Sequence, residues 1–198
     1  ERQSIALANE MTGRGHKVAF ITWDQEGAQA FYDIDPKVHW FKVGENDPKV
    51  KASISYKINR AKNVRKIAKE FKADAILGFQ QGMFLSMRLY LIGLGIHVIA
   101  AARESPFRYD FIKDGKIKNF IFQTFRLAEA ITVQCPSYVS EYPKYLQKKM
   151  TVVPNSVFLT NSKASPAGEE GARKKILCVA RLGFAKNQEA LIEAFANL

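Results

Sequence analysis

The chain has 198 residues, 47% of them hydrophobic, so it holds enough apolar material for a packed core and is not a disordered segment. Its net charge of +11 favours an anionic partner: nucleic acid, an anionic membrane or a phosphorylated substrate. The longest uncharged apolar stretch, from Leu89 to Ala102, is too short to span a bilayer.

Helices and strands are expected to alternate along the chain. Apolar residues at helical spacing predict helices over residues 1–14, 56–72, 83–95, 117–130 and 136–147. Short apolar runs predict strands over residues 16–23, 38–43, 73–79, 96–102, 130–135 and 150–155. This alternation is typical of parallel βαβ units, so the predicted fold class is α/β with a Rossmann-like, doubly wound parallel sheet. The first expected element is a helix, and the strand that should lead into it is expected to be missing from the sequence.

Residues 157–173 differ in composition from the rest of the chain. Ser, Ala, Gly, Pro and charged residues replace the periodic hydrophobic ones there, which indicates a linker. We therefore expect one Rossmann-like domain over residues 1–156 and the start of a second, truncated one over residues 174–198. In the second, Ile176–Ala180 is predicted to be a buried strand, followed by a loop and a helix.

The loop between this strand and helix carries Arg181 and Lys186. A loop after a parallel strand lies at the carboxyl end of the sheet, where ligands bind. The helix that follows offers free N–H groups and the positive end of its dipole, and Arg181 can hold phosphate oxygens through two hydrogen bonds. The loop is thus a candidate diphosphate site, and the alternative is an ordinary solvated turn.

Several segments, in this order, resemble retaining glycosyltransferases of family 4, which have the GT-B fold. "ERQSIALANEMTGRGHKV" is similar to the start of the first helix in that family. "VIAAARESP" resembles an arginine-containing loop of members that act on lipid-linked glycans or surface polysaccharides. "AEAITVQCPSYVSEY", "VVPNSV" and "VARLGFAKNQEALIEAFANL" are similar to the family's segments around the domain crossover and the donor loop.

The resemblance implies an enzyme of the hexosyltransferase type that transfers a sugar from a nucleotide sugar to a glycan or lipid-linked acceptor, in cell-surface polysaccharide, lipopolysaccharide or glycoconjugate biosynthesis. It implies that Arg181 and Lys186 bind the donor diphosphate, and that the catalytic carboxylates lie in the part of the second domain that this chain does not contain, so that the chain alone is inactive. The acceptor cleft is expected to include Arg103, Glu104, Asn155, Gln80 and Gln81, although a surface ion pair between Arg103 and Glu104 and simple loop roles for the other three are the alternatives.

The predicted helix over residues 56–72 has one apolar stripe and seven cations. An amphipathic basic helix can lie on an anionic membrane, so Lys62, Arg65, Lys66 and Lys69 are candidate membrane contacts. The alternative is a helix whose apolar stripe faces the core and whose charged face is solvated. With no transmembrane segment, the protein is expected in the cytoplasm or peripherally at the inner face of the membrane.

Two rival functions keep the predicted fold. The first is a basic α/β module that binds nucleic acid, which is disfavoured because aromatic residues do not alternate with the cations. The second is an epimerase or phosphorylase with the GT-B fold. His16, His39 and His97 have no metal-ligand spacing, and no phosphate-loop or dinucleotide motif is found, so neither a metal nor a cofactor is expected beyond the nucleotide-sugar substrate.

Overall fold

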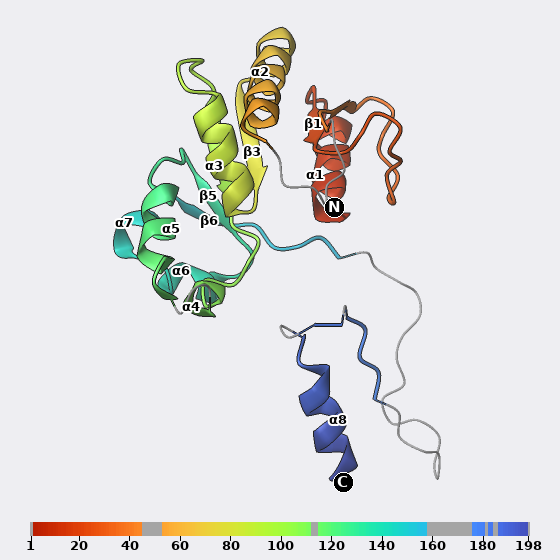
Figure 1. Ribbon diagram of the computed structural model, residues 1–198, viewed down its shortest axis with the longest axis vertical. Helices are drawn as coiled ribbons and strands as arrows, with labels where there is room; N and C mark the ends of the chain where they lie inside the picture. The colour runs from red at the N-terminus through yellow and green to blue at the C-terminus, as the bar shows by residue number, and fades with distance from the viewer. Residues whose placement is uncertain are drawn as a thin grey trace. The chain divides into compact units, whose positions relative to one another are not determined.

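The computed structural model describes residues 2–44, 53–111, 115–157, 176–180, 182–183 and 186–197. The chain divides into two compact units, Glu1–Val157 and Phe158–Leu198. The first unit is an α/β assembly of parallel strands and flanking helices (Figure 1).

The first unit alternates strands and helices as the sequence predicts. Its described strands are β1 (Ala19–Thr22), β2 (His39–Lys42), β3 (Ala75–Phe79), β4 (His97–Ala101), β5 (Ile131–Val133) and β6 (Met150–Val152). Its described helices are α1 (Arg2–Gly13), α2 (Ile54–Phe71), α3 (Gln81–Tyr90), α4 (Arg108–Phe111), α5 (Lys118–Phe125), α6 (Pro136–Ser140) and α7 (Lys144–Gln147).

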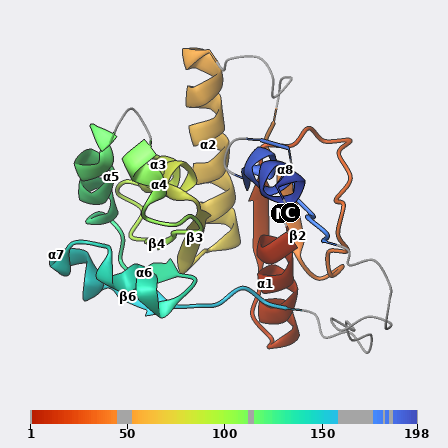
Figure 2. The same cartoon turned by 90° about the horizontal axis from the view of Figure 1, so that it is seen from below.

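The strands form two parallel sheets, one with the order β1-β2 and one with the order β3-β4-β5-β6. In the first sheet Ala19 pairs with His39, and in the second Ala75 pairs with His97. Figure 2 shows α2 between β3 and the β1-β2 pair, with α1 beside that pair. The expected Rossmann-like pattern of parallel strands and flanking helices is therefore confirmed.

The main core lies between the four-stranded sheet and its helices. Val64 of α2, Phe84 of α3 and Phe125 of α5 are fully buried there, and the rings of Phe84 and Phe125 stack with their centroids 5.8 Å apart. Gly78 permits the close contact of β3 with α3, because a Cβ atom at this position would lie 2.4 Å from the Cα atom of Phe84. Ser53 caps the start of α2, since its hydroxyl accepts a hydrogen bond from the Tyr56 N–H at 3.1 Å.

The helix predicted over residues 136–147 is two short helices, α6 and α7. Pro143 stands between them, and a proline in a helix interior would lack the N–H donor and would clash with the preceding turn. The helix predicted over residues 83–95 ends at Tyr90, because Gly93 and Gly95 adopt φ values of 79° and 69° outside the helical region. Helix α4 was not predicted from the sequence.

In the second unit, the described part contains helix α8 (Gln188–Ala196), which was predicted. The predicted strand Ile176–Ala180 is wrong for this structure: these residues are described without strand pairing and are exposed. A β-strand is stable only when it pairs with another strand, and none of the described residues of the second unit lies in a β-strand. The predicted linker, beyond Val157, lies outside the described residues.

Candidate acceptor-side site

Four polar side chains follow the carboxyl ends of the four neighbouring strands of the larger sheet. Gln80 follows β3, Arg103 follows β4, Gln134 follows β5 and Asn155 follows β6. Because parallel strands bring their carboxyl ends to one edge of a sheet, these residues gather at the edge where ligands bind in open α/β folds. We call Gln80, Arg103, Gln134 and Asn155 the carboxyl-edge cluster.

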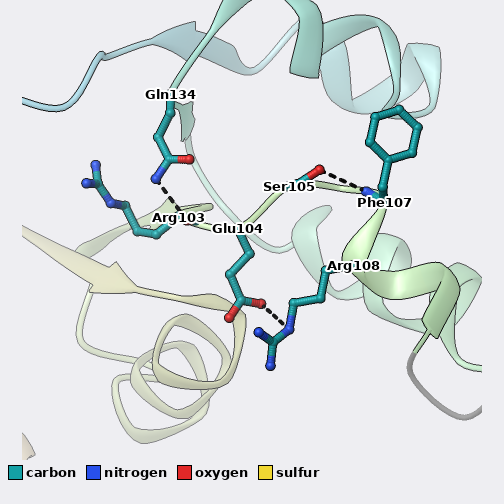
Figure 3. Close-up of polar contacts among 6 residues, drawn as sticks. All are labelled: Arg103, Glu104, Ser105, Phe107, Arg108 and Gln134. Carbon is teal, nitrogen blue, oxygen red and sulfur yellow. Dashed lines mark hydrogen bonds and ion pairs between the residues drawn. The ribbon is translucent and has the colours of Figure 1, made fainter. Parts of the chain in front are cut away.

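Arg103 is the centre of this cluster. One of its Nη atoms donates a hydrogen bond to Oδ1 of Asn155, and its guanidinium lies 5.8 Å from the centroid of the Phe79 ring. The backbone carbonyl of Arg103 accepts a hydrogen bond from Nε2 of Gln134 at 2.8 Å (Figure 3). Partial burial lowers the pKa of the Arg103 guanidinium, but an arginine stays protonated in proteins. The edge therefore carries one positioned, half-buried positive charge.

Glu104 does not pair with Arg103. Its carboxylate is 3.1 Å from Nε of Arg108, one helical turn further on, and the two side chains are drawn away from the Arg103 guanidinium in Figure 3. The Ser105 hydroxyl accepts a hydrogen bond from the Phe107 N–H at 3.4 Å, which shapes the turn into α4. The Arg103 charge is thus left without a carboxylate partner among the described residues.

Tyr109 packs behind this loop. Burial, and then the nearby charge of Glu104, raise the pKa of its phenol to about 12. The Tyr109 ring meets the ring of Phe122 edge to face, with centroids 5.8 Å apart. The tyrosine is therefore neutral at physiological pH and acts as a packed support for the loop that carries Arg103.

The two glutamines predicted for the cleft have different surroundings. Gln80 is exposed at the edge, with its backbone at φ 70° and ψ 156°, and its N–H bonds to the Ala101 carbonyl at 3.0 Å. Gln81 points into the helical layer, where its Nε2 donates to Oγ1 of Thr124 at 3.1 Å. The structure thus brings Gln80, Arg103 and Asn155 to one edge of the sheet. The side-chain amide of Gln81 instead forms a hydrogen bond that links α3 to α5.

Two residues of this edge were missed in the sequence. Gln134 was overlooked because it lies inside the strand predicted over residues 130–135, whereas β5 ends at Val133 and leaves Gln134 at the carboxyl edge. Gln3 makes reciprocal hydrogen bonds with Ser156: its Nε2 donates to the Ser156 carbonyl at 3.0 Å, and its Oε1 accepts from the Ser156 N–H at 2.9 Å. This contact between distant parts of the chain has no local sequence signal, and it holds the start of α1 next to Asn155.

The four candidate membrane contacts lie together on α2. Lys62, Arg65, Lys66 and Lys69, with Glu70, line a shallow hollow of about 360 Å³. Arg65 is half-buried, and its Nη1 donates to the carbonyls of Tyr90 at 2.5 Å and Ile92 at 2.9 Å. The three lysines are exposed, and Lys66 is 3.9 Å from a carboxylate oxygen of Glu70. Three of the four cations therefore face solvent, and Arg65 ties α2 to the end of α3.

On the donor side, Arg181 lies outside the described residues. Lys186 is exposed just before α8, and its N–H bonds to the Gly183 carbonyl at 2.9 Å. Asn187, at the start of that helix, has a φ of 47° and makes no side-chain cap. The side chain of Lys186 is therefore exposed to solvent in the described part of this loop.

Two further observations concern the described part of the chain as a whole. None of its helices combines the length and the apolar character that are needed to cross a bilayer. Within the same residues, no three His, Cys, Asp or Glu side chains lie close enough to share a metal ion.

Comparison with known proteins gives one family. No curated protein matches the chain. The profile described as Glycosyltransferase Family 4 matches residues 1–160, which include all of the first unit and the whole carboxyl-edge cluster. The match covers most of the chain and agrees with the parallel α/β architecture described above. The chain therefore belongs to glycosyltransferase family 4.

Proposed function

We propose that this chain is the acceptor-side part of a glycosyltransferase that moves a sugar from a nucleotide-sugar donor to a glycan or lipid-linked acceptor, with retention at the anomeric carbon. Membership of the family supports the transferase activity. The observation that favours an acceptor role for the first unit is Arg103, a half-buried cation without a carboxylate partner among the described residues, at the ligand-binding edge of a parallel sheet.

Arg103 suits an acceptor that carries phosphate or many hydroxyl groups. Its planar guanidinium has five N–H donors, of which only one is used by Asn155 in the structure. A half-buried charge acts in a lower dielectric than water, so it attracts an anion more strongly than a solvated lysine does. Gln80 and Asn155 add amide groups that can hydrogen-bond sugar hydroxyls from the neighbouring strand ends.

On the donor side we assign the diphosphate to Arg181 and Lys186. Sugar transfer forms a bond from the anomeric carbon to the acceptor and breaks the bond from that carbon to the diphosphate, whose oxygens gain negative charge as the nucleoside diphosphate leaves. Positive groups placed at those oxygens stabilise the transition state more than the ground state. Lys186 is free to take this role because its side chain is exposed.

We assign the face of α2 formed by Lys62, Lys66 and Lys69 to a negatively charged membrane surface, which would hold the enzyme beside a lipid-linked acceptor. A nucleic-acid function gains no support from this face. Arg65 is occupied by backbone carbonyls, and Arg60 lies over the rings of Trp23 and Tyr56 at 4.5 Å from each centroid. The basic helix therefore offers a band of lysines without free aromatic rings for base stacking.

The test is sugar transfer by the protein in its natural length. A panel of nucleotide sugars, radiolabelled in the sugar, is incubated with lipid and glycan acceptor fractions, and labelled product is counted. Arg103→Ala, Arg181→Ala and Lys186→Ala are each expected to lower turnover roughly 10- to 1000-fold. Arg126→Ala is the matched control, because the Arg126 side chain contacts Gln123 and the Tyr145 ring, away from the carboxyl-edge cluster. Wild-type rates in all three folded variants, or no transfer from any donor, would contradict the proposal.

A further inference from the structure

Four large aliphatic side chains are exposed on the neighbouring helices α2 and α3. Ile54 and Ile58 of α2 are 77% and 50% exposed. Leu89 of α3 is 54% exposed, and Ile92, in the turn that follows α3, is 60% exposed. Isolated exposed aliphatic residues are common in soluble proteins, whereas several of them on one face mark a contact surface.

The two isoleucines of α2 lie on the same face of the helix as its exposed lysines. Residues that are three or four positions apart share a helix face. That spacing gives the series Ile54, Ile58, Lys62, Lys66 and Lys69. The buried residues point to the opposite side, as Val64 does two positions after Lys62. The outer face of α2 is therefore apolar at its start and basic from Lys62 onward.

Arg65 attaches the exposed end of α3 to this face. It lies three positions after Lys62, and its Nη1 donates hydrogen bonds to the carbonyls of Tyr90 and Ile92 at 2.5 Å and 2.9 Å. The two helices lie side by side (Figure 1). Ile92 therefore lies beside the basic part of α2, and Leu89 directly precedes the bonded Tyr90. We use the name α2–α3 face for the set Ile54, Ile58, Lys62, Lys66, Lys69, Leu89 and Ile92.

The charge on this face fits a bilayer surface. The hollow on α2 is lined by four cations and one carboxylate, that of Glu70, so its net charge is positive. Lipid phosphates supply the complementary negative charge, and the acyl chains beneath them accept aliphatic side chains. A nucleic acid would supply the phosphates without an apolar layer for the four exposed aliphatic side chains. The combination of positive charge and exposed aliphatic residues thus favours an anionic bilayer.

The course of the helices shows how the α2–α3 face is oriented in the first unit. Helix α3 begins after the carboxyl end of β3 and leads to the amino end of β4. Helix α2 leads to the amino end of β3, so both helices run from the carboxyl edge of the sheet to its amino edge. A bilayer that contacts Ile54 and Ile92 alike therefore lies parallel to α2 and reaches the carboxyl edge, where Arg103 lies.

We infer that the α2–α3 face inserts into an anionic bilayer, with α2 parallel to the membrane plane. The four exposed aliphatic side chains enter the boundary between headgroups and acyl chains, about 5–10 Å deep, and the three lysines contact lipid phosphates. The inference rests on the proposed assignment of these lysines to a membrane, and it adds an apolar insertion and an orientation. In this orientation the carboxyl-edge cluster stands at the membrane surface, within reach of a lipid-linked acceptor.

Binding of the protein in its natural length to vesicles tests the insertion. The vesicles contain equal parts of phosphatidylglycerol and phosphatidylcholine, and binding is measured by co-sedimentation. Ile58→Ser combined with Ile92→Ser is expected to weaken binding about 100-fold, because burial of each half-exposed side chain favours binding about tenfold. Tyr145→Ser is the control, since Tyr145 is 42% exposed on α7, which lies away from α2 (Figures 1 and 2). At about 1 M salt, where charges are screened beyond about 3 Å, the wild type is expected to keep part of its binding and the double variant to lose it.

Tryptophan fluorescence reports the insertion directly. Ile58→Trp and Ile92→Trp are each mixed with vesicles of the same composition whose acyl chains carry bromine, which quenches tryptophans in contact with the acyl region. Quenching beyond that of the wild type is expected for both variants and is expected to be absent for Tyr145→Trp.

Three results would overturn the inference. Wild-type binding by the double Ser variant, together with weak binding when Lys62, Lys66 and Lys69 are changed to Gln, would leave the membrane assignment intact and refute the insertion. No binding of the wild type to anionic vesicles would contradict the membrane assignment and the insertion together. Equal quenching of Ile92→Trp and Tyr145→Trp would mean that the bilayer does not select the α2–α3 face.

Discussion

Replacing Arg65 by Met should destabilise the first unit. The change keeps the aliphatic stem but removes two hydrogen bonds, to the carbonyls of Tyr90 and Ile92 at the end of α3. Hydrogen bonds from a charged group contribute about 1.5–3 kcal/mol each. Both bonds come from one nitrogen and one of them is exposed, so we expect a total loss of about 2 kcal/mol.

Urea denaturation followed by tryptophan fluorescence measures this loss. The chain has 2 Trp, Trp23 and Trp40, and both lie in the first unit, so the signal reports on that unit alone. With a slope of about 2 kcal/mol per molar urea, the midpoint should fall by about 1 M. Lys62→Met on the exposed face of α2 is the matched control and should change stability by less than about 0.5 kcal/mol. Equal midpoints for Arg65→Met and wild type would refute the structural role of Arg65.

Three further predictions follow from the described contacts. Gly78→Ala forces a Cβ atom into the backbone of α3 and should cost about 1–3 kcal/mol in the same urea assay, whereas an unchanged midpoint would mean that β3 and α3 can separate. Changing Lys62, Lys66 and Lys69 together to Gln should weaken binding to anionic vesicles about 100-fold in a co-sedimentation assay, since each cation contributes about 1 kcal/mol. Neutral vesicles are the control. Equal binding of the wild type and the variant to anionic vesicles would mean that these lysines are only solvated. Tyr109 should ionise near pH 12 in an ultraviolet titration of the folded protein. Since the pKa of an unfolded tyrosine is about 10, the contribution of Tyr109 to stability is complete below pH 10 and is lost as the pH rises toward 12. Ionisation of Tyr109 at pH 10 would contradict its burial.

The order of the helices and strands in the first unit could be predicted because each depends on a local pattern. Apolar runs such as the one around Ile99 occur where parallel strands are buried, and the stripe that contains Val64 and Ala68 faces the core as expected. The position of Arg103 at a strand end was predictable for the same reason, since a residue that follows a parallel strand must lie at the carboxyl edge of the sheet.

Features that depend on distant residues could not be predicted. The contact of Gln3 with Ser156 joins positions 153 residues apart, and the sequence around either residue gives no sign of it. Arg65 has the same local pattern as Lys62 and Lys69, and only the position of the end of α3 makes it a structural residue. The strand predicted over residues 176–180 failed because strand formation requires a neighbour, which an apolar run does not provide.

The backbone of Gln80 has a consequence for engineering this protein. Its φ of 70° and ψ of 156° lie in a region that is almost exclusive to glycine and costs other residues on the order of 1–3 kcal/mol. Gln80→Gly should therefore make the first unit more stable by about 1 kcal/mol, because it relieves that strain at an exposed position. If the amide of Gln80 contacts the acceptor, the same change weakens acceptor binding and raises its KM. A variant that is more stable but binds its acceptor less well would show that the strained backbone at Gln80 lowers stability while its side chain contributes to acceptor binding.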